Sequence, residues 1–327
     1  MLQANGVSEA ISRVTCKGCI SRQYTSRHVK TKSDSLQVGN FTFHWGSRTY
    51  VMGILNITPD SFSGDGILAK GDAIRTAVEQ ARTFLENGAD VLDVGGESTR
   101  PGSQPVRVDE ELERVIPIVE AIHENFPEAL ISIDTYKAKV AEEAFKAGAN
   151  ILNDVWALRA DPELAPVAKK FNAPVILMHN RSKPASVEVR EKLGNAYIGS
   201  EYQNLIEEVK RELLESVEIA QTAGVEESHI ILDPGIGFGK TREHNLELIN
   251  RLDQIRALGY PVLLGPSRKS FIGFTLDLPA DQRVEGTAAT IAVGITRGAD
   301  IIRVHDVKEM ARVAKMTDAL VRKIERG

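Results

Sequence analysis

The residues best suited to chemistry lie directly after short apolar segments. Asp134, Asn153 and Asp233 each follow such a segment, and Lys269 and Arg303 lie at the ends of two later ones. A carboxylate can accept two parallel hydrogen bonds from a flat heterocycle with adjacent N–H donors. A lysine can donate to a ring carbonyl, and an arginine can stack on the ring face. This combination indicates a site for an amino-oxo heterocycle.

A second group of residues is suited to phosphate. The segment Gly95–Thr99 offers backbone amides and hydroxyls to an anion, and Arg100 follows it. Arg303 and His305 can add positive charge beside a second phosphate. Asn56 offers a hard oxygen ligand that can help to hold Mg²⁺ together with the phosphates. The two groups together predict a heterocyclic substrate that bears phosphate or pyrophosphate.

Each of these residues also has a purely structural interpretation. An aspartate at a strand end is more often a helix N-cap or a turn former than a catalytic group, and Asp154 and Asp306 fit that description. A lone lysine or arginine after a strand is usually a solvated surface charge. The functional interpretation is favoured because so many charges and amides at one end of a fold would be costly to place for stability alone.

The stretch LDPGIGFGKT, residues 232–241, resembles a phosphate-binding P-loop because it ends in Gly-Lys-Thr. A P-loop needs a glycine five residues before Gly239, where this chain has Pro234. We therefore expect Asp233 to be the functional residue of the stretch and Lys240 to belong to a helix start. The glycines let the chain turn sharply and bring Phe238 over the site.

Short apolar runs alternate with longer amphipathic segments from about residue 50. Each run is nearly continuous, as expected for strands buried on both faces of a parallel sheet. The predicted strands are Tyr50–Leu55, Asp90–Val94, Leu130–Ile133, Asn150–Leu152, Pro174–Met178, His229–Leu232, Pro261–Leu264 and Asp300–Val304. The predicted helices between them include Asp72–Asn87, Asp109–Asn125, Ala138–Ala147 and Asn204–Ala223.

This repeated unit of one strand and one helix predicts an α/β fold, a (β/α)₈ or TIM barrel. A doubly wound sheet is the alternative, but regular units without a second zone of composition favour the barrel. Residues 1–35 are predicted to be a basic, disordered extension and residues 36–327 a single domain. A hairpin within Gly39–Tyr50 is expected to cover the lower end, with the catalytic groups after the carboxyl ends of the strands.

Composition excludes several classes of protein. The chain has 327 residues and a net charge of -5. Residues 1–34 carry six Lys and Arg and two acids, so the remainder is acidic, which argues against nucleic acid as a partner. Apolar runs are too short to span a membrane, and Cys16 and Cys19 lack the second ligand pair of a metal site. We expect a cytoplasmic protein, or an organellar one if the extension is a transit peptide.

The chain resembles the dihydropteroate synthase family over residues 48–320. The similar segments are GILNITPDSFSGDG (53–66), DVGGESTRPGS (93–103), SIDT (132–135), LNDV (152–155), ILDPGIGFGKT (231–241), GPSRKSFIG (265–273), GTAAT (286–290) and RVHDV (303–307). The resemblance implies a TIM barrel, a homodimer, a Mg²⁺ cofactor and a sulfonamide target. It implies an enzyme of folate biosynthesis that joins (7,8-dihydropterin-6-yl)methyl diphosphate to 4-aminobenzoate, giving 7,8-dihydropteroate and pyrophosphate.

The resemblance also implies roles for individual residues. Those for the pterin are Asp134, Asn153, Asp233, Lys269 and Arg303, with Met178 and Phe238 as apolar walls. Those for the diphosphate are Asn56, Thr99, Arg303 and His305, and Asn56 is also the metal residue. Those for the aminobenzoate are Phe62, Thr99, Arg100, Pro101, Ser267 and Phe238. The implied catalytic residues are Asp134, Lys269, Arg100 and Asp65.

Two segments depart from the family pattern. The first loop has its acid, Asp65, one place later than usual, and Asn180–Pro184 differs after the fifth strand. One alternative is a pterin-binding methyltransferase with a corrinoid partner, which would not need the TPDSF, STRPG and SRKS segments. The other is a non-catalytic pterin-binding protein, and the presence of Asn56, Arg100 and Lys269 argues against it.

Overall fold

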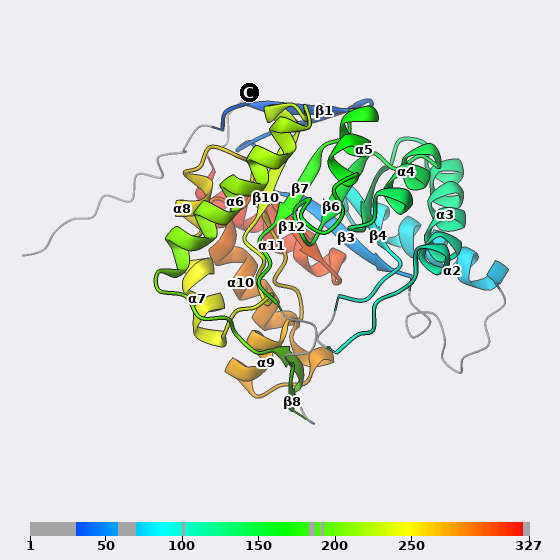
Figure 1. Cartoon of the computed structure of the whole chain (residues 1–327). Coiled ribbons are helices and arrows are strands. Elements are labelled where there is room, and N and C mark those ends of the chain that lie inside the picture. Colours follow the sequence, from blue (N-terminus) through cyan, green and yellow to red (C-terminus); the bar gives the residue numbers. More distant parts are fainter. Residues whose placement is uncertain (1–30, 58–69, 100–101, 183–186, 191–192, 323–327) are drawn as a thin grey trace, which may run out of the picture.

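The computed structural model describes residues 31–57, 70–99, 102–182, 187–190 and 193–322. Its main sheet has eight parallel strands in the order β10-β7-β6-β5-β4-β3-β12-β11 (Figure 1). A bridge between Leu232 and Val262 joins the two outermost strands and closes the sheet into a barrel. The strands are β3 (Tyr50–Asn56), β4 (Val91–Gly95), β5 (Leu130–Asp134), β6 (Ile151–Asp154), β7 (Val175–Met178), β10 (Ile230–Asp233), β11 (Leu263–Leu264) and β12 (Ile301–Val304). The predicted TIM barrel is confirmed.

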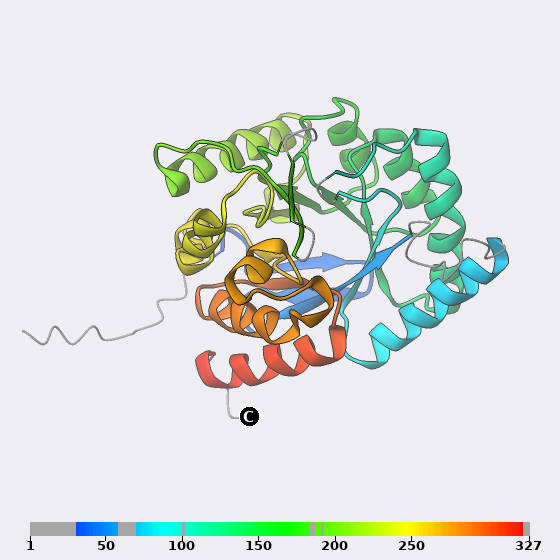
Figure 2. The ribbon, with the colours of Figure 1, turned by 90° about the horizontal axis from the view of Figure 1, so that it is seen from below.

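Helices surround the strands as an outer layer (Figure 2). They are α2 (Lys70–Glu86), α3 (Val108–Asn125), α4 (Ala138–Lys146), α5 (Leu164–Lys170), α6 (Leu205–Thr222), α7 (Arg242–Asn250), α8 (Leu252–Arg256), α9 (Ser270–Leu276), α10 (Val284–Thr296) and α11 (Val307–Val321). Among the described helices, none is long and apolar enough to cross a membrane. The predicted bounds agree to within two residues, because strands buried on both faces and helices with one apolar face have different apolar patterns.

A small antiparallel hairpin closes the N-terminal end of the barrel. Its strands are β1 (Ser35–Val38) and β2 (Phe41–His44). The Phe43 ring stacks on Trp45 with centroids 5.0 Å apart and meets Tyr50 edge-on at 4.8 Å. These rings pack on apolar residues near the beginnings of the barrel strands: Met52, Val91, Leu130, Ile151, Ile176, Ile231, Leu263 and Ile301. The expected hairpin is therefore present, but it begins before Gly39 and ends before Tyr50, which is the first residue of β3.

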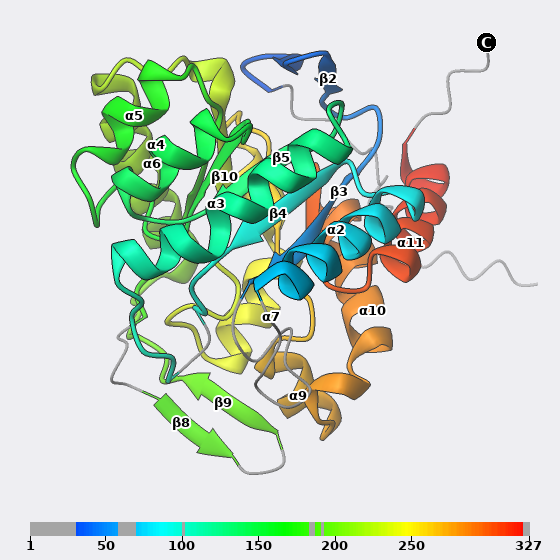
Figure 3. The same ribbon diagram turned by 90° about the vertical axis from the view of Figure 1, so that its right-hand side faces the viewer.

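A second hairpin lies between β7 and α6, away from the first (Figure 3). It pairs β8 (Val187–Arg190) with β9 (Gly194–Tyr197) in an antiparallel register. The sequence pattern alone does not predict this hairpin. The alternation Val-Glu-Val-Arg is typical of a strand, but four residues are too few to distinguish a strand from a loop.

Candidate active site

The parallel register places the predicted polar residues at one level of the barrel. Gly95 pairs with Asn56 on one side and with Asp134 on the other. Asp134 pairs in turn with Asn153. Gly95 also leaves room for its neighbour, because a Cβ atom on it would lie 3.3 Å from the Cβ of Asp134. Neighbouring strands thus present these side chains together at the C-terminal end of the barrel.

Arg303 lies between two carboxylates inside the barrel. Its Nε donates to Asp93 across 2.5 Å, and a terminal N–H donates to Asp134 across 2.6 Å. The Asn153 amide donates to the same Asp93 carboxylate across 3.2 Å. Burial raises the pKa of Asp134 to about 7, which Arg303 opposes and the Asp93 charge reinforces. Burial acts to lower the pKa of Arg303, but the two carboxylates raise it overall, so the guanidinium stays charged.

Asp93 belongs to the candidate site, although the sequence pattern assigned it no role there. It lies within β4 and is fully buried, so it read as part of an apolar strand. The sequence nevertheless indicated a special role for Asp93, because it is an acid within an apolar strand. An ionisable residue in a strand buried on both faces needs a partner inside the protein. That partner is Arg303, 210 positions later in the chain.

The loop after β10 brings Asp233, Phe238 and Lys269 together. Asp233 accepts a hydrogen bond from the Gly235 amide across 2.7 Å. The Lys269 ammonium donates to the Ile236 carbonyl and lies 4.7 Å from the centre of the Phe238 ring. Gly235 has φ +69°, and a Cβ atom there would lie 1.8 Å from a backbone oxygen of the segment after β7. Only glycine permits this close approach, so the loop can turn back over the end of the barrel.

Burial shifts the pKa values of Asp233, at the end of β10, and of Lys269, the N-cap residue of α9. It raises the pKa of Asp233, although Lys269 and the Gly235 amide oppose the shift. It lowers the pKa of Lys269 to about 8, although Asp233 opposes that shift. Met178, which pairs with Asp233 in the sheet, is buried and adds an apolar wall.

Ser267 and His305 lie together on the side of the barrel predicted to bind phosphate. The Ser267 hydroxyl accepts from the His305 backbone N–H across 3.2 Å and lies 3.0 Å from the Nδ1 of its ring. His305 directly follows β12, which pairs with β3, and Asn56 is the last residue of β3. His305 and Asn56 therefore lie at the ends of adjacent strands.

Thr99 lies on a segment that is held from two sides. Glu97, two residues earlier, accepts from the Lys137 ammonium across 2.5 Å. On the other side, the Tyr197 hydroxyl of the β8–β9 hairpin donates to the Thr99 carbonyl across 3.0 Å. The Tyr197 ring centre lies 6.0 Å from that of Phe238. The hairpin thus connects two residues predicted to face the aminobenzoate.

Other predicted residues have different outcomes. Phe62, Asp65, Arg100 and Pro101 lie outside the described residues.

Asp154 is a turn former, as its structural interpretation proposed, because its carboxylate accepts the backbone N–H of Trp156. Asp306 makes no side-chain cap and forms an ion pair with Arg268 instead. Lys240 lies directly before the N-cap of α7, so it is at a helix start as expected, and its side chain is buried.

The fit to Mg²⁺ depends on Asn56. In the part of the chain that the structure describes, no group of three or more His, Cys, Asp or Glu is placed to hold a metal ion. Asn56 offers one neutral oxygen at the end of β3. Mg²⁺ keeps several waters and is commonly bound through substrate phosphates with few protein ligands. The residue therefore suits a Mg²⁺ ion that arrives with a diphosphate.

Comparison with known proteins agrees with this geometry. Residues 52–305 match the protein family described as pterin binding enzyme. The dihydropteroate synthase of Clostridium beijerinckii is 52% identical over 289 residues, which cover 88% of this chain and 100% of that protein. The dihydropteroate synthase of Bacillus subtilis is 47% identical over 298 residues, covering 91% and 98%.

Solved structures show the same relationship. A dihydropteroate synthase from Clostridium difficile, crystallised in the presence of pteroic acid, has a TM-score of 0.78 and 46% identity, with 86% of this chain and 100% of that chain covered. The Xanthomonas albilineans enzyme with 4-aminobenzoic acid has a TM-score of 0.77 and 37% identity, with 88% and 98% covered. The predicted family is confirmed. The chain therefore belongs to the dihydropteroate synthases, the transferases of folate synthesis within the pterin-binding enzyme family.

Proposed function

We propose that the C-terminal end of this barrel transfers the (7,8-dihydropterin-6-yl)methyl group from its diphosphate to 4-aminobenzoate, giving 7,8-dihydropteroate and pyrophosphate. One observation above all supports the proposal: Asp134 and Asp233 converge with Lys269 and Arg303 on one end of the barrel. This set offers two acceptors and two donors to a single flat ring. A pterin has the complementary set, with adjacent N–H donors and a ring carbonyl.

The pterin ring is assigned to the interior of this end. The Asp233 carboxylate accepts from the ring N–H groups, and the Lys269 ammonium donates to the ring carbonyl. Asn153 adds an amide beside Asp134, with which it pairs in the sheet. The Arg303 guanidinium lies against the ring face, and Met178 and Phe238 are its apolar walls. The burial of Asn153 and Asp233 favours the proposal, because buried polar groups need partners and a pterin supplies them.

The reaction breaks the bond between the methylene carbon and the diphosphate oxygen, and its electron pair leaves with the diphosphate. Arg303 and His305, with Thr99, bind the departing anion and stabilise its charge. The carbon becomes electron-poor, and the ionised Asp134 stabilises it electrostatically. The amine nitrogen of the aminobenzoate then forms the new C–N bond and releases a proton. This weak but neutral nucleophile needs mainly to be positioned.

The metal requirement is part of the proposal. When bound, Mg²⁺ supplies charge neutralisation to the diphosphate. Asn56 would hold it from the end of β3, beside His305 on β12. The metal-free chain is therefore expected to bind a pterin that lacks diphosphate as well as the loaded chain does.

The aminobenzoate is assigned to the outer part of the same end. Its predicted contacts are Phe62, Thr99, Arg100, Pro101, Ser267 and Phe238, and Asp65 is predicted to help the first loop close. The link from Tyr197 to Thr99 and Phe238 supports this location, since it brings two of these residues into one wall. The crystallised Xanthomonas enzyme holds 4-aminobenzoic acid, which is the same second substrate.

A homodimer and a cytoplasmic location are further parts of the proposal, with an organelle as the alternative. Exposed apolar side chains on neighbouring helices, Leu246 of α7 and Val293 of α10, suit a contact between two copies. Analytical ultracentrifugation of the wild type and of Leu246→Arg tests this proposal. If the two side chains lie in a dimer contact, the variant should have a lower molecular mass in solution than the wild type. Sequencing the N-terminus of the natural protein tests whether residues 1–34 persist.

The decisive assay mixes the purified protein with dihydropterin-methyl diphosphate, Mg²⁺ and 4-aminobenzoate and measures dihydropteroate and pyrophosphate. Both products are expected, and a chelator should abolish them. A second reaction with methyltetrahydrofolate and a corrinoid protein tests the methyltransferase alternative. Folded protein that binds pterin but forms neither product would be the non-catalytic pterin binder and would refute the synthase.

Three variants separate the assigned roles. Lys269→Ala and Asp233→Ala should weaken the binding of diphosphate-free pterin by about tenfold or more, because each removes a charge-assisted hydrogen bond. Asn56→Ala should leave that binding unchanged and reduce turnover of the diphosphate substrate. Equal effects of all three on diphosphate-free pterin would contradict these roles.

A further inference from the structure

Lys240 is buried beside the proposed pterin site, with 3% of its surface exposed. Its ammonium is surrounded by neutral acceptors: the carbonyls of Gly235 at 2.9 Å and Phe238 at 3.0 Å, and the Nδ1 atom of His179 at 2.9 Å. Burial of a charged group without an adjacent countercharge is costly. That cost lowers the pKa of Lys240 to about 7, although Asp233 opposes the shift. A methionine of similar length would fill the same space at lower cost, so packing alone does not explain a lysine here.

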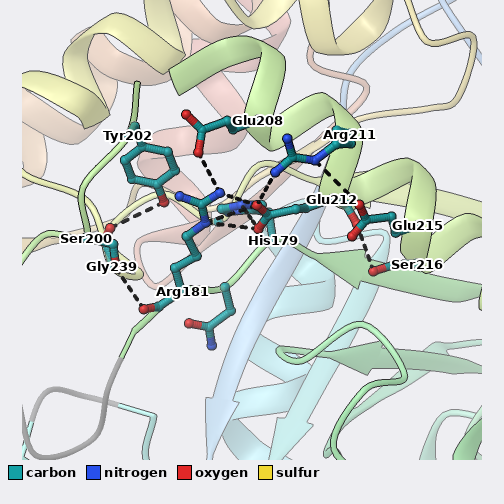
Figure 4. Close-up of polar contacts among 12 residues, drawn as sticks. His179, Arg181, Ser200, Tyr202, Glu208, Arg211, Glu212, Glu215, Ser216 and Gly239 are labelled. Carbon is teal, nitrogen blue, oxygen red and sulfur yellow. Dashed lines mark hydrogen bonds and ion pairs between the residues drawn. The ribbon is translucent and has the colours of Figure 1, made fainter. Parts of the chain in front are cut away.

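His179 and Glu212 set the orientation of Lys240. Because His179 accepts from Lys240 at Nδ1, its other nitrogen must carry the proton, and Nε2 lies 3.1 Å from a Glu212 carboxylate oxygen. Burial lowers the pKa of His179 to about 3, which keeps the ring neutral and preserves this tautomer. Glu212 is held by Arg181, which also donates to Glu208 across 2.7 Å. Figure 4 shows Glu208 and Glu212 of α6 pointing toward Arg181 and His179 of the segment after β7.

The two carbonyls that Lys240 holds belong to the loop that forms the pterin wall. Gly235 donates its amide to Asp233, and Phe238 is the ring beside Lys269. Between them, the Ile236 carbonyl accepts the Lys269 ammonium. The positions of Asp233, Phe238 and Lys269 therefore all depend on the loop conformation that Lys240 stabilises from behind.

We propose that Lys240, oriented by His179 and Glu212, is a positioning residue that sets the Asp233–Phe238 loop for pterin binding. It touches neither substrate. Replacing Lys240 should change the affinity for the pterin and not the affinity for the aminobenzoate. The reason is that the loop contacts the pterin through Asp233 and positions Lys269 through the Ile236 carbonyl. The inference rests on the proposed function.

The first test replaces Lys240 with methionine and measures binding of 6-hydroxymethylpterin by calorimetry, followed by both KM values. Lys240→Met should weaken pterin binding about tenfold, in line with the loss of hydrogen bonds to a charged donor. The KM for the pterin diphosphate should rise similarly, and the KM for 4-aminobenzoate should stay within about twofold. The matched control is Arg256→Met, which removes another buried cation, the partner of Asp300 at 3.0 Å before β12. That control should lower thermal stability and leave pterin affinity unchanged.

A second pair of variants decides the question if Lys240→Met does not fold. His179→Asn keeps an acceptor oxygen near the position of Nδ1, and His179→Leu removes it. Pterin affinity should be largely retained in the first and reduced in the second.

Three results would overturn the inference. They are wild-type pterin affinity in folded Lys240→Met, equal increases in both KM values, or equal pterin affinities in the two His179 variants. If the wild-type protein itself fails to bind 6-hydroxymethylpterin, the proposed function fails instead, so the two failures are distinguishable.

Discussion

Arg303 on β12 donates its Nε–H to Asp93 on β4 across 2.5 Å, although β3 separates the two strands in the barrel. The same guanidinium also reaches Asp134, so one arginine is shared by two buried carboxylates. Two negative charges around one positive charge leave an excess that burial makes costly. Burial raises the pKa of Asp134, and the Asp93 charge adds to that shift although Arg303 opposes it. The arrangement is suited to a site in which a cationic intermediate provides the missing charge.

Asp93→Asn should reduce kcat/KM for the pterin diphosphate by about tenfold to a hundredfold, because Arg303 loses one of its two charged anchors. The pKa of Asp134 should also fall, since the Asp93 charge raises it, and the acidic limb of the pH–rate profile should move to lower pH. The matched control is Ser132→Ala, because Ser132 pairs with Asp93 and its hydroxyl has no hydrogen-bond partner among the described residues. An unchanged rate in Asp93→Asn would remove Asp93 from the site.

Asp134→Asn should abolish most activity and stabilise the protein at alkaline pH. The folded-state pKa of Asp134, about 7, lies above its unfolded value of about 3.9. Its favourable contribution is therefore fully present below the unfolded pKa and is lost as pH rises through 7. The slope is at most about 1.4 kcal/mol per pH unit for one group. Thermal unfolding should show a difference between variant and wild type that grows from pH 5 to pH 8, and a constant difference would contradict this assignment.

Lys269 should impose an alkaline limit on the reaction. Burial lowers its pKa to about 8, so above that pH the ammonium loses the proton that we assign to the pterin carbonyl. The rate constant kcat/KM for the pterin diphosphate should fall above about pH 8 with the titration of one proton. Lys269→Arg should be slower at neutral pH but lack this limb, because arginine stays protonated. If kcat/KM of Lys269→Arg falls above about pH 8 in the same way, a group other than Lys269 causes the fall.

Tyr197 should affect the second substrate. Tyr197→Phe removes the bond to the Thr99 carbonyl and keeps the ring near Phe238, so the KM for 4-aminobenzoate should rise about fivefold. Tyr197→Ala removes both contacts and should have a larger effect, with the KM for the pterin diphosphate nearly unchanged. The control is Tyr260→Phe, whose hydroxyl contacts Lys32 and Glu227 instead. If Tyr197→Phe matches this control, the β8–β9 hairpin has no role in binding the amine.

Phe43 should matter for stability alone. It is fully buried among Trp45 and Tyr50 at the N-terminal end of the barrel. Phe43→Ala should lower the free energy of unfolding by about 3–5 kcal/mol through lost burial and a cavity. Chemical denaturation measures this loss, and both KM values should remain at wild-type levels. Changed KM values in a folded variant would show that the two ends of the barrel are coupled.

The barrel could be predicted because its signals are local. Strands buried on both faces are continuous apolar runs, and the helices between them have one apolar face, so each element is visible in a short window of sequence. The carboxyl ends of parallel strands share one end of a barrel, so the chain order alone predicted that Asn56, Asp134 and Asp233 lie at the same end. The short hairpin β8–β9 lacked such a signal, so the contact of its Tyr197 with the Thr99 carbonyl could not be anticipated.

Asp93 and Lys240 show what the sequence could not provide. Asp93 lies between Leu92 and Val94, and Lys240 lies between Gly239 and Thr241. The role of each charge depends on a partner far away in the chain, which is Arg303 for Asp93 and His179 for Lys240. The sequence by itself determined the family, the barrel and the end of the barrel at which the candidate site lies, because these depend on local patterns and strand order. Only the tertiary structure decided that Arg303 is shared by two carboxylates and that Lys240 binds the carbonyls of the loop after β10. A buried charge is costly unless a partner lies beside it, and only the folded geometry brings such distant partners together.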